Sequence, residues 1–330
     1  MNVVYTFDDG YTMITMVSLV SFLESNREVE EVNLFIVDCG ISESNKGLLE
    51  SISRFFGRSI TFRKAIDLKE RIPIGLNAAY WSTVCYVRLF FADMFPELDR
   101  IMHIDCDTVV RGNLSEIYEV EMRGRVCAAC YDCVAASKRK IGIPNPKPYI
   151  SNGLLVFDLK GLREQRIEEE FVKYIVEKEG NLPHLDQDVI SAVIGERTII
   201  LPPKYNLMSI TVAYGELCGA FFDENDPYYK KEELKEAASN PIVVHYVGNR
   251  FMGRPWVRPC FHPFNDEWRK HYKKVGQITG VEDLAGIKRW KFIRALAGFI
   301  WNIGHKIGFI RRLELAFDVQ YYRKKGRNIK

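Results

Sequence analysis

The sequence predicts an α/β protein whose sheet is covered by helices on both faces. Short runs rich in β-branched and aromatic residues alternate along the chain with longer segments of helical period. Such alternation favours strands and helices packed as layers around a shared core. With 330 residues and 47% hydrophobic composition, the chain can bury a large core. Charged residues make up 27% and aromatic residues 12%, which excludes an intrinsically disordered protein.

The expected elements follow one another in a regular order. Strands are expected at residues 3–7, 32–37, 60–63, 100–104, 126–129, 153–159 and 242–247. Helices are expected at residues 13–25, 43–57, 80–95, 161–179 and 186–195. Ligands of such sheets bind beyond the carboxyl ends of the strands. Functional residues are therefore expected where the apolar runs end.

Charge is distributed unevenly along the chain. The formal net charge is +3, but residues 271–330 carry 14 Lys and Arg against 4 Asp and Glu, so residues 1–270 carry a net −7. We expect an acidic body at residues 1–275 and a basic, aromatic-rich helical segment at residues 276–330. No uncharged apolar run reaches about 18 residues, which disfavours a spanning helix. Eight cysteines without a secretory leader favour a cytoplasmic protein with reduced thiols.

The clearest motif is Asp105-Cys106-Asp107, directly after the expected strand at residues 100–104. In an extended chain, residues i and i+2 point to the same side, so the two carboxylates leave the strand together. Carboxylate oxygens suit a hard divalent cation such as Mg²⁺ or Mn²⁺, and such a cation can hold a diphosphate. The alternative is a pair of solvated turn carboxylates.

Two further strand ends carry candidate ligands. His245 ends an apolar run and precedes Gly248, Arg250 and Arg254, so an imidazole and phosphate-clamping guanidiniums come close together in sequence. The alternative is a buried histidine followed by a basic loop. The acidic turn at residues 8–11 ends the first strand and could bind a base or ribose, although Asp is also common before a helix.

Three cysteines, Cys127, Cys130 and Cys133, have a spacing that could suggest a metal cluster. No fourth ligand lies nearby in sequence, and a β-like segment would point the thiols to different faces. We therefore expect small buried cysteines rather than a cluster.

Taken together, these segments resemble glycosyltransferase family 8, most closely its bacterial lipopolysaccharide galactosyl- and glucosyltransferases. The resemblance covers roughly residues 1–275 and rests on the order of six motifs. These are Asp8-Asp9-Gly10-Tyr11, Tyr86-Val87-Arg88-Leu89, Asp105-Cys106-Asp107, the Asn152-Gly153 strand, Asp186-Gln187-Asp188, and His245 with Gly248 ahead of Arg254-Pro255-Trp256. The family implies a GT-A nucleotide-diphospho-sugar transferase fold with a mixed, mainly parallel sheet, a UDP-sugar donor, Mn²⁺ or Mg²⁺, and retention of anomeric configuration.

The resemblance also implies a role for each matching residue. Asp105, Asp107 and His245 match the metal ligands. The implied donor site comprises Thr6, Asp8, Tyr11, Arg88, Asp105, Cys106, Gly248, Arg250 and Arg254. Arg254 stands where the family usually has Lys, and the spacing before it is longer, so either Arg254 or Arg250 can take the diphosphate contact.

The implied catalytic and acceptor residues lie in the middle of the chain. Asp186 and Gln187 match the residues closest to the reacting sugar, and Asp132 matches a residue that contacts donor or acceptor. Ser151 and Asn152 match the acceptor side, with Ser151 where the family often has Asn. Because Gln187 is a poor nucleophile, we expect a front-face substitution in which the leaving phosphate accepts the proton of the acceptor.

The expected activity is transfer of glucose or galactose from UDP-glucose or UDP-galactose to a saccharide or glycolipid in cell-surface polysaccharide synthesis. One alternative is a self-glucosylating, glycogenin-like initiator that uses Tyr321 or Tyr322. A nucleic-acid-binding protein with a basic tail is a third interpretation, but no nucleic-acid-binding motif is present, and we expect no nucleic acid partner.

The basic tail from about residue 288 to residue 330 is expected to form short amphipathic helices on the inner face of the cell membrane. Lys and Arg border an apolar stripe, a pattern typical of helices that lie on anionic lipid. The alternative is a helix packed on the catalytic domain. The stripe comprises Trp290, Phe292, Ile293, Leu296, Phe299, Ile300, Ile303, Ile307 and Ile310.

Overall fold

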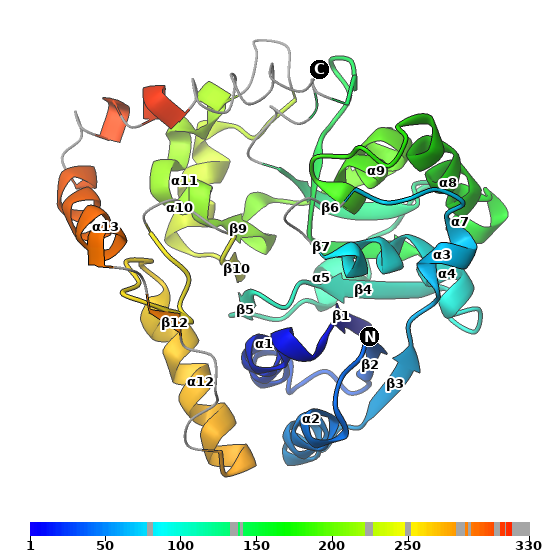
Figure 1. Ribbon diagram of the computed structural model, residues 1–330, viewed down its shortest axis with the longest axis horizontal. Coiled ribbons are helices and arrows are strands. Elements are labelled where there is room, and N and C mark those ends of the chain that lie inside the picture. Colours follow the sequence, from blue (N-terminus) through cyan, green and yellow to red (C-terminus); the bar gives the residue numbers. More distant parts are fainter. Residues whose placement is uncertain are drawn as a thin grey trace.

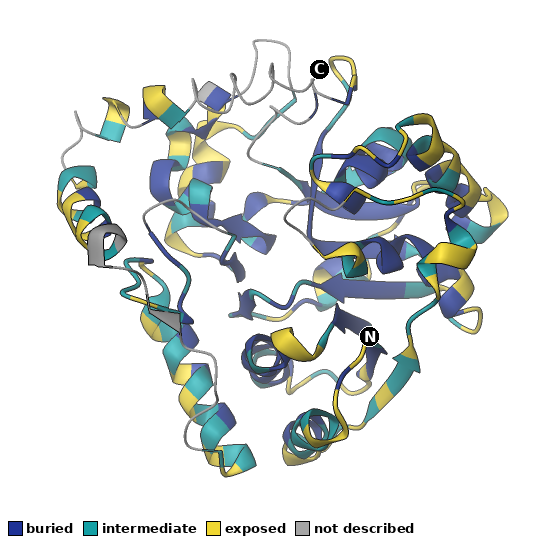
Figure 2. Cartoon of the chain, viewed as in Figure 1, coloured by how far each residue is buried: buried dark blue, intermediate teal, exposed yellow. Residues whose placement is uncertain are grey.

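The computed structural model has a central sheet between two helical layers (Figure 1). It describes residues 1–77, 82–132, 138, 141–221, 227–247, 252–281, 288–289, 292–306, 311–313 and 315–318. Buried residues concentrate in the strands and on the inward helix faces (Figure 2). The expected α/β class is confirmed.

The main sheet has the strand order β3-β2-β1-β4-β7-β6-β8 within the described residues. Its strands are β1 (Asn2–Phe7), β2 (Asn33–Asp38), β3 (Ile60–Lys64), β4 (Arg100–Ile104), β6 (Cys127–Tyr131), β7 (Ile150–Asp158) and β8 (Thr198–Ile200). β7 runs antiparallel to both neighbours, and every other pairing is parallel. The sheet is thus mixed and mainly parallel, as expected.

Alternate residues of each strand supply two separate cores. Val3 and Tyr5 of β1 face one core, whereas Val4 faces the other. The first core is covered by α1 (Thr12–Ser25), α2 (Glu43–Phe55) and α12 (Asn265–Thr279). The second is covered by η2 (Thr83–Phe90), α4 (Phe91–Met94), α7 (Leu159–Glu164), α8 (Ile167–Glu177) and α9 (Leu185–Ile194).

A small second sheet stands beside the carboxyl end of β4. Its strand order is β5-β10-β9, formed by β5 (Thr108–Val110), β10 (Val243–His245) and β9 (Leu207–Met208). β10 is antiparallel to β5, so His245 pairs with Thr108, immediately after Asp107. This pairing brings a residue from late in the chain to the Asp105–Asp107 turn.

α12, β12 (Lys288–Arg289) and α13 (Phe292–His305) lie along one side of the molecule (Figure 1). β11 (Val257–Arg258) pairs with β12, and α13 follows. α12 runs across residue 275, the expected boundary, and packs Trp268 and Val275 into the first core. The remaining elements are η1 (Asp9–Tyr11), α3 (Leu68–Arg71), α5 (Ser115–Tyr118), η3 (Gly195–Arg197), η4 (Pro203–Tyr205), α10 (Ser209–Tyr214), η5 (Gly215–Phe221) and α11 (Lys231–Ser239).

Candidate active site

The candidate residues converge on one edge of the main sheet. β1 and β4 are parallel, so their carboxyl ends place Asp8 and Asp105 at the same edge. β7 is antiparallel to β4, and Asn152 and Gly153, near the start of β7, therefore lie beside the same turn. The Asp105 amide donates to the Gly153 carbonyl oxygen at 3.0 Å. The register thus brings the candidate residues together beyond the strand ends.

Asp105, Asp107 and His245 form a compact cluster of potential metal ligands. One ligand atom from each lies within 4.8 Å of the others. His245 Nε2 is 3.0 Å from Asp107 Oδ1 and 3.7 Å from Asp105 Oδ2. Burial acts to raise the pKa of Asp107, but His245 and Arg254 outweigh it and leave that pKa below its usual value. Burial lowers the pKa of His245, but Asp107 outweighs it and raises that pKa.

Asn206 fixes the orientation of the His245 ring, a role the sequence did not reveal. Its Nδ2 donates to the Ser151 hydroxyl at 2.9 Å, which turns its Oδ1 toward His245 Nδ1 at 3.0 Å. Nδ1 therefore carries a proton, and Nε2 faces the carboxylates. Nε2 donates to Asp107 while the ring is protonated, and it offers a lone pair to a cation once the ring is neutral. Asn206 sits before β9 in a stretch without any motif, so no signal in the sequence could have found it. Ser151, expected on the acceptor side, is buried and supports Asn206.

Arg88 bridges the metal-ligand cluster and α9. Its guanidinium lies 3.1 Å from Asp105 Oδ1 and 3.2 Å from Asp186 Oδ2, and it is only 7% exposed. Asn152 Nδ2 donates to the same Asp186 oxygen. Burial, together with the charge of Asp105, outweighs Arg88 and raises the pKa of Asp186 to about 6. Arg88 therefore holds two carboxylates from different elements in fixed positions.

Gln187 connects α9 with two strands. Its side chain accepts from the Asn152 amide at 3.4 Å and donates to Asp132 Oδ2 at 3.0 Å. Asp132 directly follows β6, so Asp132, Asn152 and Gln187 form one hydrogen-bonded row. The structure thus brings together the expected reacting-centre residues.

The first strand ends in the acidic turn expected to hold the base and ribose. Asp9 accepts from the Ser42 amide and hydroxyl and from Asn45, so it ties this turn to α2. Tyr11 is 40% exposed, and burial together with Asp107 raises its pKa. Thr6 is buried and its carbonyl oxygen accepts from Cys106 Sγ at 3.8 Å, which places both beneath the turn.

Arg254 lies between β10 and β11 and approaches the cluster of Asp105, Asp107 and His245. Its Nη2 is 3.8 Å from Asp107 Oδ2, and its guanidinium lies over the Trp256 ring at 5.4 Å from the centroid. Gly248 and Arg250, also expected at the donor site, lie outside the described residues, as do Cys133, Tyr321 and Tyr322. Cys127 and Cys130 are buried in β6.

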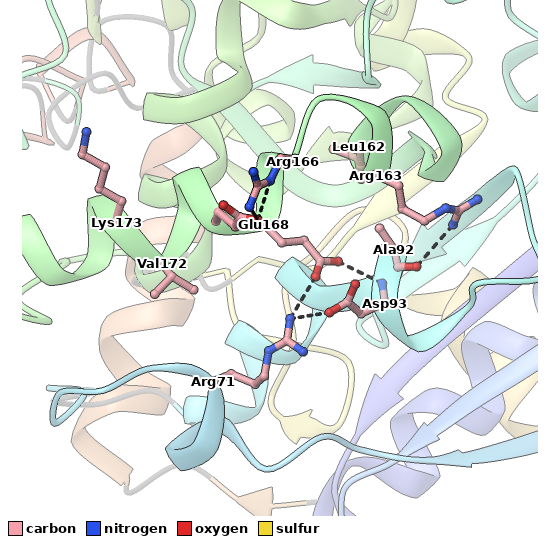
Figure 3. Close-up of a pocket in the computed structure, with 10 residues that line it drawn as sticks. Arg71, Ala92, Asp93, Leu162, Arg163, Arg166, Glu168, Val172 and Lys173 are labelled. Atoms are coloured by element: carbon pink, nitrogen blue, oxygen red, sulfur yellow. Dashed lines mark hydrogen bonds and ion pairs between the residues drawn. The ribbon is translucent and has the colours of Figure 1, made fainter.

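A separate cavity of about 550 Å³ lies between α3, α4, α7 and α8. Figure 3 shows Arg71 reaching both Asp93 and Glu168 at this cavity. Glu168 also accepts from the Asp93 amide at 3.1 Å. These ion pairs join three helices and involve none of the candidate catalytic residues.

Comparison with known proteins agrees with this geometry. The sequence model of glycosyl transferase family 8 matches residues 2–259. The chain belongs to glycosyltransferase family 8. General stress protein A of Bacillus subtilis (strain 168) is 24% identical over 274 residues, which cover 81% of this chain and 91% of that protein. Lipopolysaccharide 1,2-glucosyltransferase of Escherichia coli (strain K12) is 25% identical over 272 residues, covering 80% and 75% respectively.

Among solved structures, the fold of this glycosyltransferase matches galactosyltransferase LgtC in complex with donor and acceptor sugar analogs. The TM-score is 0.70 at 20% identity, and the match covers 83% of this chain and 96% of LgtC. The expected family and the GT-A-like fold are thus confirmed. In the part of the chain that the structure describes, no helix is long and apolar enough to cross a membrane.

Proposed function

We propose that this glycosyltransferase transfers glucose or galactose from a UDP-sugar, with retention of anomeric configuration, to a saccharide or glycolipid acceptor in cell-surface polysaccharide synthesis. The observation that carries the proposal is the cluster of Asp105, Asp107 and His245 beside two guanidinium groups. Such a cluster answers the main demand of the reaction, which is to stabilise negative charge on a leaving nucleoside diphosphate. The relative named lipopolysaccharide 1,2-glucosyltransferase supports the acceptor class.

The residues present fit Mn²⁺ or Mg²⁺. Two carboxylates and an imidazole are suitable ligands, and Mn²⁺ accepts the imidazole more readily. Asn206 holds the far nitrogen of His245, as is usual for a metal-binding histidine. Asp105 gives one oxygen to Arg88 and keeps the other toward His245. When bound, the cation supplies Lewis-acid stabilisation of the diphosphate charge.

The arrangement of Asp186 supports a front-face substitution. Its Oδ2 is already engaged by Arg88 and Asn152, so this oxygen is poorly placed to attack the sugar as a nucleophile. Gln187 can hold the sugar by hydrogen bonds without forming a stable ester. In this mechanism the leaving phosphate oxygen takes the proton of the acceptor hydroxyl as the new bond forms on the same face.

The tail supports contact with an anionic membrane surface. Leu296, Phe299, Ile300 and Ile303 are all exposed on α13 at helical spacing, with fractions of 48% to 62% (Figure 2). The flanking cations Lys306, Arg311 and Arg312 suit anionic headgroups. A glycolipid acceptor would present its sugar at such a surface.

The metal-dependent step can be tested by release of UDP from UDP-glucose and UDP-galactose. We expect turnover with Mn²⁺ or Mg²⁺, none in chelator, and a fall of about 100-fold or more in Asp105→Asn and Asp107→Asn. Asp99→Asn is the matched control, because Asp99 is 82% exposed at the other end of β4. Full turnover of wild type in chelator, or of both ligand variants, would contradict the metal assignment.

A further inference from the structure

The reacting-centre residues sit on a turn with an uncommon backbone. Asp186 and Gln187 lie in the first turn of α9, and Leu185, the first residue of that helix, has a φ of 50°. A left-handed conformation is unfavourable for a branched side chain such as leucine. The turn therefore needs support from its surroundings, and residues that act only on the turn can control where Asp186 and Gln187 lie.

Asp188, the residue directly after Gln187, provides that support. Its side chain is fully buried, and its Oδ2 accepts the His184 amide at 2.7 Å, which closes the turn over Leu185. Its Oδ1 accepts the Tyr149 hydroxyl at 2.6 Å. The same hydroxyl oxygen lies 3.2 Å from His184 Nδ1. The Asp188 carboxylate thus joins the His184 end of the turn both to α9 and to Tyr149.

Tyr149 attaches this turn to the strand that carries Asn152. It directly precedes β7, whose Asn152 hydrogen-bonds both Asp186 and Gln187. We propose that Asp188 and Tyr149 are positioning residues that set the distance between the α9 turn and β7, and thereby place Asp186 and Gln187 for the reaction. The inference deepens the proposed function and rests on it.

A second contact between α9 and β7 offers a matched control. The Ser191 hydroxyl accepts the Ile150 amide at 3.0 Å and donates to the Ile150 carbonyl oxygen at 3.3 Å. Ser191 is as deeply buried as Asp188 but lies one turn further along the helix. Ser191→Ala therefore weakens the same packing without touching the turn.

The test compares Asp188→Asn, Tyr149→Phe and Ser191→Ala in steady-state UDP-sugar hydrolysis and in amide hydrogen exchange. Asn at position 188 can accept from only one of its two donors, because its amide nitrogen cannot accept. We expect kcat to fall about 10- to 100-fold in Asp188→Asn and about tenfold in Tyr149→Phe, with the donor KM within about twofold. Exchange at residues 184–187 should be faster in both, whereas Ser191→Ala should keep its kcat within about twofold.

Each possible result either supports or contradicts the positioning role of Asp188 and Tyr149. Unchanged kcat in both turn variants, an equal fall in Ser191→Ala, or a fall without faster exchange at residues 184–187 would overturn the positioning role. If Asp188→Asn does not fold, Tyr149→Phe carries the comparison, because it removes a single hydroxyl. If wild type hydrolyses no UDP-sugar, the proposed function fails, and the exchange rates alone decide whether Asp188 and Tyr149 hold the turn.

Discussion

Arg254 is the described cation best placed to meet a diphosphate beside the metal-ligand cluster. Its side chain is 23% exposed, and its guanidinium contacts both the Trp256 ring and Asp107 Oδ2. Stacking on an indole limits the freedom of the side chain while leaving its N–H groups available. An Arg here provides a planar pair of donors where the family usually provides a single ammonium group.

We predict that Arg254→Ala weakens UDP binding about tenfold or more, because a charge-assisted contact with phosphate is lost. Isothermal titration with UDP in Mn²⁺ buffer measures this. Arg258→Ala is the control, since Arg258 is an exposed residue of β11. If Arg250→Ala weakens binding and Arg254→Ala does not, the diphosphate contact belongs to Arg250.

At the scale of single residues, the sequence revealed the candidate metal ligands but not the residues that support them. Asp105, Asp107 and His245 were predictable because each follows an apolar run that ends abruptly. Asn206 was not predictable, because its role depends on the pairing of β9 with β10, which joins residues 37 positions apart in the sequence. Arg88 was predictable only by resemblance, because its two carboxylate partners come from distant elements.

At Gly153, β7 passes close behind the His245 ring. A Cβ at this position would lie 2.2 Å from His245 Nδ1 and 2.7 Å from Asn206 Oδ1. We predict that Gly153→Ala displaces His245 and weakens Mn²⁺ binding about tenfold or more, because ring orientation is lost. The binding constant can be measured by titrating the protein with Mn²⁺ and monitoring the free ion by electron paramagnetic resonance.

The matched control for this change is Gly47→Ala. Gly47 lies within α2, and a Cβ there would meet nothing within 4 Å. Its replacement should leave Mn²⁺ binding unchanged and favour the helix slightly. Wild-type Mn²⁺ affinity in Gly153→Ala would show that His245 does not ligate the cation from its observed position.

Glu168 joins α8 to α4 and α3 at the cavity shown in Figure 3. Burial and the nearby Asp93 raise its pKa to about 8, despite the contact with Arg71. The folded state therefore keeps this proton longer than the unfolded chain, so its contribution to stability falls as pH rises from about 4.5 to 8. We predict that the Tm of wild type falls relative to that of Glu168→Gln between pH 5.5 and 8.5.

Scanning calorimetry at several pH values measures this difference. Glu169→Gln is the control, because Glu169 is 64% exposed and pairs only with Arg166 among the contacts described at this helix end. Its Tm should track wild type at every pH. Parallel Tm profiles for wild type and Glu168→Gln would contradict the raised pKa.

The helices were less predictable than the strands. β4 has the bounds expected from its apolar run, β1 and β3 are each one residue longer than expected, and β2 is shifted by one residue. The single helix expected at residues 161–179 is instead α7 and α8, separated at Arg166, which has a φ of 53°. Residues 164–167 contain no Gly or Pro that would predict this break. We attribute the break to tertiary packing, which can override local helix preference. β5, β8 and β9 are too short to have a periodic signal.

At the scale of the whole molecule, the tail has two different faces. Trp301 and Leu315 are buried in a third apolar cluster with Tyr214 and Phe221. The Tyr214 hydroxyl donates to Asp318 at 2.6 Å, and His305 Nε2 donates to the Ala213 carbonyl oxygen at 2.7 Å. The tail is thus attached to α10 and η5 by its inner face, and truncation near residue 280 would expose that cluster.

The outer face of α13 is therefore the part to change in a test of membrane binding. Phe299 and Ile300 are 54% and 62% exposed, and each would contribute about 2 kcal/mol if buried in lipid. We predict that Phe299→Asp combined with Ile300→Asp abolishes co-sedimentation with vesicles containing phosphatidylglycerol, because two apolar anchors become anionic. UDP-sugar hydrolysis should remain within about twofold, since both side chains are exposed and neither belongs to the candidate active site. Phe55→Asp is the matched control, because Phe55 is 57% exposed on α2. Wild type that fails to sediment at low salt, or a double variant that sediments as wild type does, would contradict a membrane-binding α13.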